Sequence, residues 1–485
     1  MNIKMNVNIN CLLKYLFPFL IIPVLMTGGV KSAQAVSASP LPPPDKLKYP
    51  TLQFNPPPTQ RVVLDNGIVL HILENHELPL ININALVKTG TMYDPQGKAG
   101  VAELTAYVMR TGGTKKLSST EIDKQLDSIA ASVSVKMTLE FAQINFSILR
   151  ENLEKGIELL SQIVTQPAME KDKFELAVQL KKEELRRIKD DPQKLAFREF
   201  NKLIYANDPR GSFSSHNSLA NIERTDLVEF HNRFFMPNNI IVAISGDITR
   251  EEAVEIFRRY FGGWQSREIP AYLPPPNGKL KAGIYCIDKN IPQSTIVSGQ
   301  FTTGKSDPDF YSFSVLDFII GSGGFSSRIF NAIRNNEGLA YSAGSFYRAK
   351  PAYGVFGTYA FTKTSSTMKT LFLINSILEK IKTNTITSDE ANWAKQSIIN
   401  GFVFSFDTPE HIAWQYVNRE SEKLPADFLI NYRDKIEKVS VKDLNNAAAK
   451  YLDRTKNVVF ILGDSKKFDK SPATEDQLIF IVPEE

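Results

Sequence analysis

An internal repeat is the feature that most constrains the fold of this 485-residue chain. Asp226 lies at the start of a helical segment that leads into an apolar strand and then to Asp247, 21 residues later. The same series recurs from Asp443 to Asp464 with the same spacing, 217 residues further along. Matched spacing favours duplication of one supersecondary pattern over chance similarity. The expected fold class is therefore α+β, with two homologous mixed sheet-plus-helix domains in tandem.

Changes in composition along the chain predict where these domains begin and end. The Pro274-Pro-Pro276 run, followed by Asn277-Gly278, is typical of a stiff, exposed linker. The expected organisation is a signal peptide (1–35), a Pro-rich leader (36–58), an N-terminal domain (59–265), a linker (266–280), a C-terminal domain (281–470) and a tail (471–485).

The first 35 residues predict export from the cytoplasm. Lys4 and Lys14 accompany a short apolar run that is followed by Ala33-Gln34-Ala35, as in a secretory signal peptide cleaved after Ala35. The run is too short to span a bilayer, so we expect a periplasmic protein with no membrane span after cleavage. Cleavage removes three lysines and no acid and lowers the net charge from +4 to +1, which argues against nucleic acid as a partner. Cys286 is then the sole cysteine, so an internal disulfide is excluded.

Two local motifs predict element boundaries in the first domain. Asn66-Gly67 separates two apolar runs and is a strong signal for a β-hairpin. Ser118 and Glu121 have the spacing of a helix capping box. A third strand is expected over residues 81–87.

The segment Gly100–Met109 predicts an apolar helix, and a Gly-Gly-Thr sequence ending at Thr114 follows it. This arrangement resembles the active-site helix of the pitrilysin, insulinase and mitochondrial-processing-peptidase family of zinc peptidases. Members of the family carry H-x-x-E-H there, with two His ligands for one zinc and a Glu that activates water. The corresponding positions here hold Glu103, Ala106 and Tyr107. The resemblance therefore implies a degenerate zinc site, with no metal bound and no catalytic residue supplied by this chain alone.

The resemblance also implies a distal ligand position. The family has a third ligand, a Glu, 77 residues beyond the second His, and this spacing falls on Glu184, with Pro192 following as in the family. One alternative is that Glu103 and Glu184 hold a hard cation together with waters. We favour Glu184 as a helix residue that is hydrogen-bonded near Tyr107.

No other histidine pair replaces the missing ligands. The five histidines are His71, His76, His216, His231 and His411, and no two have the helical spacing of metal ligands. We expect each of them to be structural or solvated.

The second domain retains a different family motif. The segment Ile333–Tyr341 matches the family pattern R-x-x-x-G-L-A-Y, with Arg334 and Tyr341 seven residues apart. In such relatives this pair projects into the peptide chamber and hydrogen-bonds the substrate backbone. A guanidinium and a phenol are suitable donors to a carbonyl that gains negative charge. The alternative is a helix-end arginine and a core tyrosine.

Loss of the zinc ligands with retention of the Arg/Tyr pair implies a non-catalytic subunit. Some bacterial relatives are heterodimers in which one subunit holds zinc and the other supplies this pair. We expect a zinc-bearing homologous peptidase subunit as partner, with zinc in that partner and short or unfolded peptides as substrates. The alternative is a secreted homodimer that binds peptides or serves as a scaffold. An independent peptidase with a non-standard centre is disfavoured because both the ligands and the base are missing.

Overall fold

The computed structural model describes residues 54–277, 281–383, 385–470 and 478–482. The expected signal peptide, most of the leader and most of the tail lie outside these ranges. Within them, no helix is both long and apolar enough to cross a bilayer.

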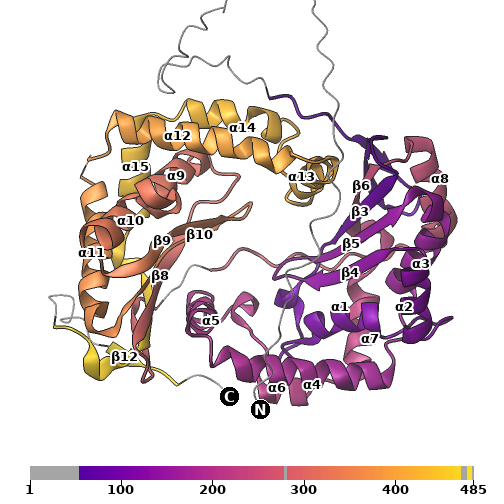
Figure 1. Cartoon of the computed structure of the whole chain (residues 1–485), viewed down its shortest axis with the longest axis horizontal. Helices are drawn as coiled ribbons and strands as arrows, with labels where there is room; N and C mark the ends of the chain where they lie inside the picture. Colours follow the sequence, from indigo (N-terminus) through magenta and orange to yellow (C-terminus); the bar gives the residue numbers. More distant parts are fainter. Residues whose placement is uncertain (1–53, 278–280, 384, 471–477, 483–485) are drawn as a thin grey trace, which may run out of the picture. The chain divides into compact units, whose positions relative to one another are not determined.

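Two six-stranded mixed sheets organise the described chain (Figure 1). The first sheet has the order β1-β2-β6-β3-β5-β4, and the second has the order β12-β7-β11-β8-β10-β9. The strands of the first sheet are β1 (Gln60–Val63), β2 (Val69–Glu74), β3 (Leu80–Val87), β4 (Ser132–Met137), β5 (Ala142–Leu149) and β6 (Ile240–Gly246). Those of the second are β7 (Gly283–Asp288), β8 (Gln293–Thr302), β9 (Ala340–Ala349), β10 (Gly354–Lys363), β11 (Val458–Gly463) and β12 (Leu478–Phe480).

The two sheets share one topology over five strands. The series β2-β6-β3-β5-β4 and β7-β11-β8-β10-β9 each begin with a parallel pair and continue with antiparallel pairs. The repeated strands β6 and β11 occupy the same position in their sheets. The fold class expected from the repeat, two sheet-plus-helix domains in tandem, is confirmed.

Helices connect the strands in both halves. Those of the first half are α1 (Val101–Thr111), α2 (Ser119–Ser128), α3 (Leu153–Thr165), α4 (Lys171–Ile188), α5 (Pro192–Ile204), α6 (His216–Ala220), α7 (Arg224–Phe234) and α8 (Arg250–Phe261). Those of the second are α9 (Phe310–Asp317), α10 (Arg328–Phe330), α11 (Thr367–Ile381), α12 (Ser388–Phe402), α13 (Pro409–Ser421), α14 (Phe428–Glu437) and α15 (Val441–Tyr451). Two π-helical segments, η6 (Phe318–Ser322) and η8 (Asn331–Asn336), continue α9 and α10.

The local motifs expected from the sequence are present. β1 and β2 form an antiparallel hairpin across Asn66-Gly67, and Gly67 has the positive φ (91°) that such a turn needs. Ser118 caps α2, and its side chain and that of Glu121 form the reciprocal capping box.

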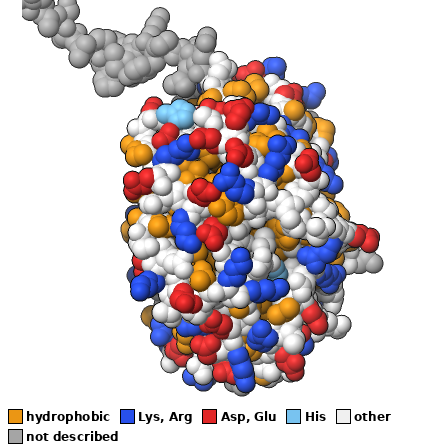
Figure 2. Space-filling model, turned by 90° about the vertical axis from the view of Figure 1, so that its right-hand side faces the viewer, with side chains coloured by type: hydrophobic (Ala, Val, Ile, Leu, Met, Phe, Trp, Pro, Cys, Tyr) orange, Lys and Arg blue, Asp and Glu red, His pale blue; other side chains and the backbone are white. Residues whose placement is uncertain are grey.

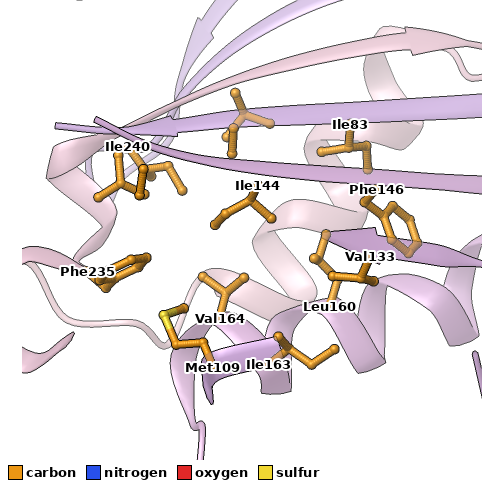
Figure 3. Packing of buried hydrophobic residues seen from close by; sticks show 14 of the residues in the cluster. Ile83, Met109, Val133, Ile144, Phe146, Leu160, Ile163, Val164, Phe235 and Ile240 are labelled. Atoms are coloured by element: carbon orange, nitrogen blue, oxygen red, sulfur yellow. The ribbon is translucent and has the colours of Figure 1, made fainter. Parts of the chain in front are cut away.

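The largest hydrophobic core lies between the first sheet and its helices. Figure 3 shows Ile83, Ile144 and Ile240 of the strands facing Met109 of α1 and Leu160 of α3. A separate core in the second half joins α9, α11, α12 and α15 to strands β9 and β10. Each half therefore buries its own sheet face against its own helices.

Two helices cross between the halves. α5, from the first half of the sequence, buries Leu195 and Phe200 against Val297 and Phe460 of the second sheet. α13, from the second half, buries Ala413 and Val417 against Leu86 and Ile241 of the first sheet. Each sheet is thus covered on one face by a helix from the other half of the chain.

The outer face shown in Figure 2 carries interspersed positive and negative side chains with small hydrophobic areas between them. No large area of one sign is visible on that face, in keeping with the nearly balanced charge of the chain.

Candidate functional site

The helix α1 carries the degenerate zinc-site positions, and the partly buried carboxylate of Asp94 fixes its start. Asp94 accepts hydrogen bonds from the backbone N–H groups of Gly100 and Ala102, both at 2.7 Å. Gly100 adopts a left-handed conformation (φ 114°) that turns the chain into the helix. Burial raises the pKa of Asp94 to about 7, and the two backbone donors oppose this rise.

The three chemical positions of the peptidase motif have different environments. Glu103 is in the first turn of α1, with 37% of its side chain exposed. Ala106 is buried and offers no donor atom for a metal, whereas Tyr107 is 42% exposed. α1 therefore presents one carboxylate and one phenol in place of two imidazoles and a base.

A lysine joins the remaining acidic positions. The Lys181 ammonium on α4 lies 2.8 Å from Glu103 Oε2 and 3.0 Å from Glu184 Oε2. Ser214 Oγ donates to the same Glu103 oxygen at 3.4 Å. Burial lowers the pKa of Lys181, but the carboxylates of Glu103 and Glu184 raise it by a larger amount. The resulting pKa of Lys181 lies above its ordinary value. Lys181 is therefore charged at neutral pH.

This arrangement does not fit a zinc ion. A protein zinc site needs three donor side chains, usually including imidazole, and no group of three His, Cys, Asp or Glu suited to a metal occurs within the described ranges. The Lys181 ammonium also occupies the space between the two carboxylates where a hard cation would bind. Glu184 is a helix residue, as expected, and its hydrogen-bond partner is Lys181 of its own helix rather than a residue of α1.

Lys181 is the residue that sequence reasoning missed at this site. It stands three positions before Glu184 on α4, within a Lys-Lys-Glu-Glu sequence. That spacing alone indicates an ordinary surface pair within a helix. Only the packing of α4 beside α1 brings Glu103 to the same ammonium.

Arg334 and Tyr341 lie together at the other candidate site. Arg334 belongs to η8, and Tyr341 is the second residue of strand β9, which begins shortly after Gly338, a residue with a positive φ of 61°. The Arg334 guanidinium lies over the Tyr341 ring, 4.5 Å from its centroid. The Tyr341 side chain is 81% exposed, so the alternative of a core tyrosine does not describe this residue.

Two phenylalanines extend this cluster. The guanidinium of Arg334 is 4.9 Å from the ring centroid of Phe330 and 5.6 Å from that of Phe325. Phe325 is 71% exposed and packs edge-on against Phe330 at 4.8 Å. Contacts with three rings orient the guanidinium while its N–H groups stay available to solvent or a peptide.

His71, expected to be structural or solvated, is buried and hydrogen-bonded. Its Nε2 lies 2.8 Å from Glu420 Oε2, and its Nδ1 lies 2.8 Å from Thr59 Oγ1. Glu420 also accepts two hydrogen bonds from Arg61, at 2.9 and 2.8 Å. This network ties α13 to the hairpin of the first sheet, and its role is structural.

Comparison with known proteins adds independent information. The profile described as Insulinase (Peptidase family M16) matches residues 72–214, and the profile described as Peptidase M16 inactive domain matches residues 221–398. A Helicobacter pylori protein named "Non-peptidase homolog YmxG" is 26% identical over 411 residues, covering 82% of this chain and 92% of that protein. A Rickettsia bellii protein named "Uncharacterized zinc protease" is 27% identical over 305 residues, covering 62% of this chain and 72% of that protein.

Solved structures agree on the fold. A Pseudomonas fluorescens structure described as a peptidase M16 inactive domain superposes with a TM-score of 0.78 at 22% identity, covering 85% of this chain and all of that one. A Helicobacter pylori protease structure superposes with a TM-score of 0.75, covering 84% of this chain. The matched profiles, the shared fold and the altered zinc-site positions lead to one conclusion. The chain is a member of the insulinase family of zinc peptidases, peptidase family M16, and a pseudo-peptidase homologue within it.

Proposed function

We propose that this chain is the non-catalytic subunit of a heterodimeric zinc metalloendopeptidase. In this proposal it supplies half of the peptide chamber and the Arg334/Tyr341 contacts to the substrate backbone. The zinc-bearing homologous subunit holds the metal and activates the water. The complex acts on short or unfolded peptides in the periplasm, where the expected signal peptide would direct the chain.

The observation that supports the proposal most strongly is the contrast between the two sites. At the first, the Lys181 ammonium stands between Glu103 and Glu184, the two acidic residues among the four degenerate zinc-site positions. At the second, an oriented guanidinium and an 81% exposed phenol remain together. Exposed aromatic groups and oriented donors are typical of binding surfaces. Both groups can donate to a peptide carbonyl that gains negative charge during hydrolysis at a neighbouring zinc.

Reconstitution tests the proposal. Hydrolysis of a quenched peptide library is measured with added zinc for three samples: this chain, a relative from the same genome that carries H-x-x-E-H, and their mixture. We expect activity that appears or rises sharply only in the mixture. Chelator-sensitive hydrolysis by this chain alone would contradict the assignment of the first site.

A substitution then tests the assigned residues. Removing one donor to a developing oxyanion costs about 10²–10³-fold in rate in other enzymes, so Arg334→Ala is expected to lower the activity of the mixture by at least about 10-fold while the complex still assembles. Arg186→Ala is the matched control, because Arg186 is a largely exposed surface residue on α4. Normal turnover in Arg334→Ala would refute the role assigned to Arg334.

The second candidate is a homodimeric peptide-binding or scaffold protein. This second candidate is supported by the name of the Helicobacter pylori relative, which describes that protein as a non-peptidase homologue. In that case, mixing with the zinc-bearing relative has no effect on hydrolysis, and this chain forms a dimer by itself.

A further inference from the structure

An open cavity lies beside the helical segment that carries Arg334. It measures about 320 Å³ and is lined by residues of η7 (Gly324–Ser326), α10, η8, α11 and α12. Small-molecule sites usually measure about 300–1,000 Å³. The segment α10–η8 forms one wall and α11, which lies next to α10 in Figure 1, forms the other. Arg334 and Tyr341 are not among the lining residues, so the cavity is separate from their cluster.

An ion pair closes one end of the cavity. Arg328 donates from Nε and Nη2 to the two carboxylate oxygens of Glu390, both at 2.8 Å. The same guanidinium donates to the hydroxyl of Thr385 at 2.9 Å and to its carbonyl at 2.8 Å. Four hydrogen bonds hold the guanidinium in place, and the two charges of the pair cancel. This end of the cavity is therefore ordered and adds no net charge.

Lys380 is the unmatched charge of the lining. Thr385, which accepts from Arg328, also donates to the Lys380 carbonyl at 3.1 Å, so Lys380 lies at the same end of the cavity. Among the residues that the structure describes, no acidic side chain is within ion-pair distance of its ammonium, and neighbouring Glu379 is paired with Lys382 at 3.0 Å.

The charge balance of the lining selects the kind of ligand. Two cations, Arg328 and Lys380, and one anion, Glu390, give the lining a net charge of +1. A single unmatched cation suits a ligand with one negative charge. A carboxylate carries one such charge, whereas a phosphate monoester carries about 1.5–2 at pH 7. A carboxylate is therefore the better match to Lys380.

The rest of the lining adds neutral hydrogen-bonding groups. Asn331 Oδ1 accepts from Asn335 Nδ2 at 2.6 Å, and the Asn331 amide nitrogen has no acceptor among the described residues. Ser326 and Asn336 also line the cavity, and within the described ranges their side chains form no hydrogen bond. A ligand with a carbonyl or hydroxyl oxygen can use these donors.

The polar groups are spread along the cavity, with an apolar surface between them. Asn336 is next to Glu337, which pairs with Lys369 in the first turn of α11 at 2.7 Å. Lys380 is in the last turn of the same helix, so Asn336 and Lys380 mark opposite ends. Ile377, one turn before Lys380, lines the space between them. The hydrocarbon part of an organic acid gains dispersion contacts there that an inorganic anion does not use.

We propose that this cavity binds a small organic acid, with its carboxylate on Lys380, its hydrocarbon part on Ile377 and an amide or hydroxyl group at Asn331. The ligand lies against η8 without meeting the guanidinium of Arg334, which is on the same segment but outside the lining. The site belongs to this chain alone, so it does not depend on a zinc-bearing partner.

Ligand-observed NMR titration of the mature chain tests the proposal with three probes: 4-acetamidobutyrate, its uncharged analogue 4-acetamidobutanamide, and inorganic phosphate. We expect the carboxylate to bind at least about 5-fold more tightly than the uncharged analogue, since a hydrogen bond to a charged group contributes a difference of this size. We also expect it to bind more tightly than phosphate, which has no hydrocarbon part to contact Ile377.

Three variants locate the binding. Lys380→Gln is expected to remove the preference for the carboxylate, because Arg328, the other cation of the lining, is held by Glu390. Ile377→Trp is expected to block the carboxylate by filling the cavity, and thermal melting checks that it is folded. Lys442→Gln is the matched control, because it removes the same charge from an exposed position on α15 that does not line the cavity. It is expected to bind all probes as the unmodified chain does.

The outcomes that would overturn the proposal are distinct. Equal binding of the carboxylate and its uncharged analogue, an unchanged preference in Lys380→Gln, or no binding of any probe would each do so. Phosphate that binds as tightly as the carboxylate would also overturn it and leave an anion site only. The Lys380→Gln comparison decides the proposal even where Ile377→Trp does not fold. No readout involves hydrolysis, so these results are independent of the proposed heterodimer.

Discussion

Replacing Glu420 with alanine should loosen the attachment of α13 to the first sheet. Glu420 receives two hydrogen bonds from Arg61 and one from His71, and it is the last charged group of α13 before the helix ends. Burial lowers the pKa of His71, so its ring is neutral at pH 7 and its Nε2–H donates to the carboxylate. The Thr59 hydroxyl then donates to Nδ1.

The expected loss can be worked out from exposure. The Arg61 side chain is 48% exposed, so its ion pair contributes about 0.5–1 kcal/mol. His71 is 1% exposed, and leaving its N–H without an acceptor costs about 1–3 kcal/mol. Together these terms predict a loss of about 1.5–4 kcal/mol in the free energy of unfolding. For a chain of this length, that corresponds to a fall in melting temperature of roughly 2–4 °C.

Differential scanning calorimetry at pH 7 measures the change. Glu379→Ala is the matched control, because Glu379, which is 49% exposed, pairs with Lys382 one helical turn away, and its loss is expected to cost under about 0.5 kcal/mol. Glu420→Gln keeps an oxygen acceptor for His71 and should lie between the two. A Glu420→Ala melting temperature equal to that of the control would refute the inference that this network stabilises α13.

The pH dependence of the network has a definite sign. Although burial raises the pKa of Glu420, the hydrogen bonds from Arg61 and His71 outweigh it and hold the pKa at about 2. Because the folded pKa lies below the ordinary value of 4.5, the stabilisation is complete above pH 4.5 and is lost as the pH falls towards 2. The difference in stability between the unmodified chain and Glu420→Gln should therefore shrink over that range.

Three further outcomes are expected. His231 is buried, and burial lowers its pKa from 6.5 to about 4. Its contribution to the free energy of unfolding, up to about 3 kcal/mol, is therefore present above pH 6.5 and lost as the pH falls towards 4. Denaturant titrations of His231→Gln at each pH should not show this loss, and a pH profile identical to that of the unmodified chain would contradict the assignment. Lys181→Met should change the free energy of unfolding by no more than about 1 kcal/mol, because removing the cost of burying the ammonium offsets the lost ion pairs with Glu103 and Glu184. A loss above about 2 kcal/mol, measured by urea unfolding, would contradict this balance and show that the ion pairs stabilise the fold. Gly156→Ala should destabilise the protein by about 1–2 kcal/mol, because a Cβ there would lie 2.1 Å from Ile148 Cδ1 and the overpacking outweighs a gain of about 1 kcal/mol in helix propensity. Gly401→Ala, where a Cβ would meet nothing within 4 Å, should be stabilising when both variants are compared by differential scanning calorimetry.

The positions of the candidate site residues could be predicted from motif spacing, but their contacts could not. The degenerate positions Glu103, Ala106 and Tyr107 and the distal Glu184 follow from residue counts along the chain, because a family motif is a local pattern. What fills that site does not follow from such counts. Lys181 has the ordinary spacing of a surface helix pair with Glu184, and its second carboxylate, Glu103, is far away in sequence. Arg334 and Tyr341 were predicted from their motif, but the three-ring cluster that orients the guanidinium is visible only in space.

Three features could be predicted from the order of residues alone: the duplicated α+β architecture, the hairpin at Asn66-Gly67 and the capping box at Ser118. Each of these depends on the order of neighbouring residues, since turn conformation, helix capping and hydrophobic periodicity act over a few positions. By contrast, the packing of α5 on the second sheet and of α13 on the first, and the contact of Lys181 with Glu103, appear only in the folded chain. Those outcomes depend on which apolar faces meet across the chain, and hydrophobic packing does not specify a partner in the local sequence.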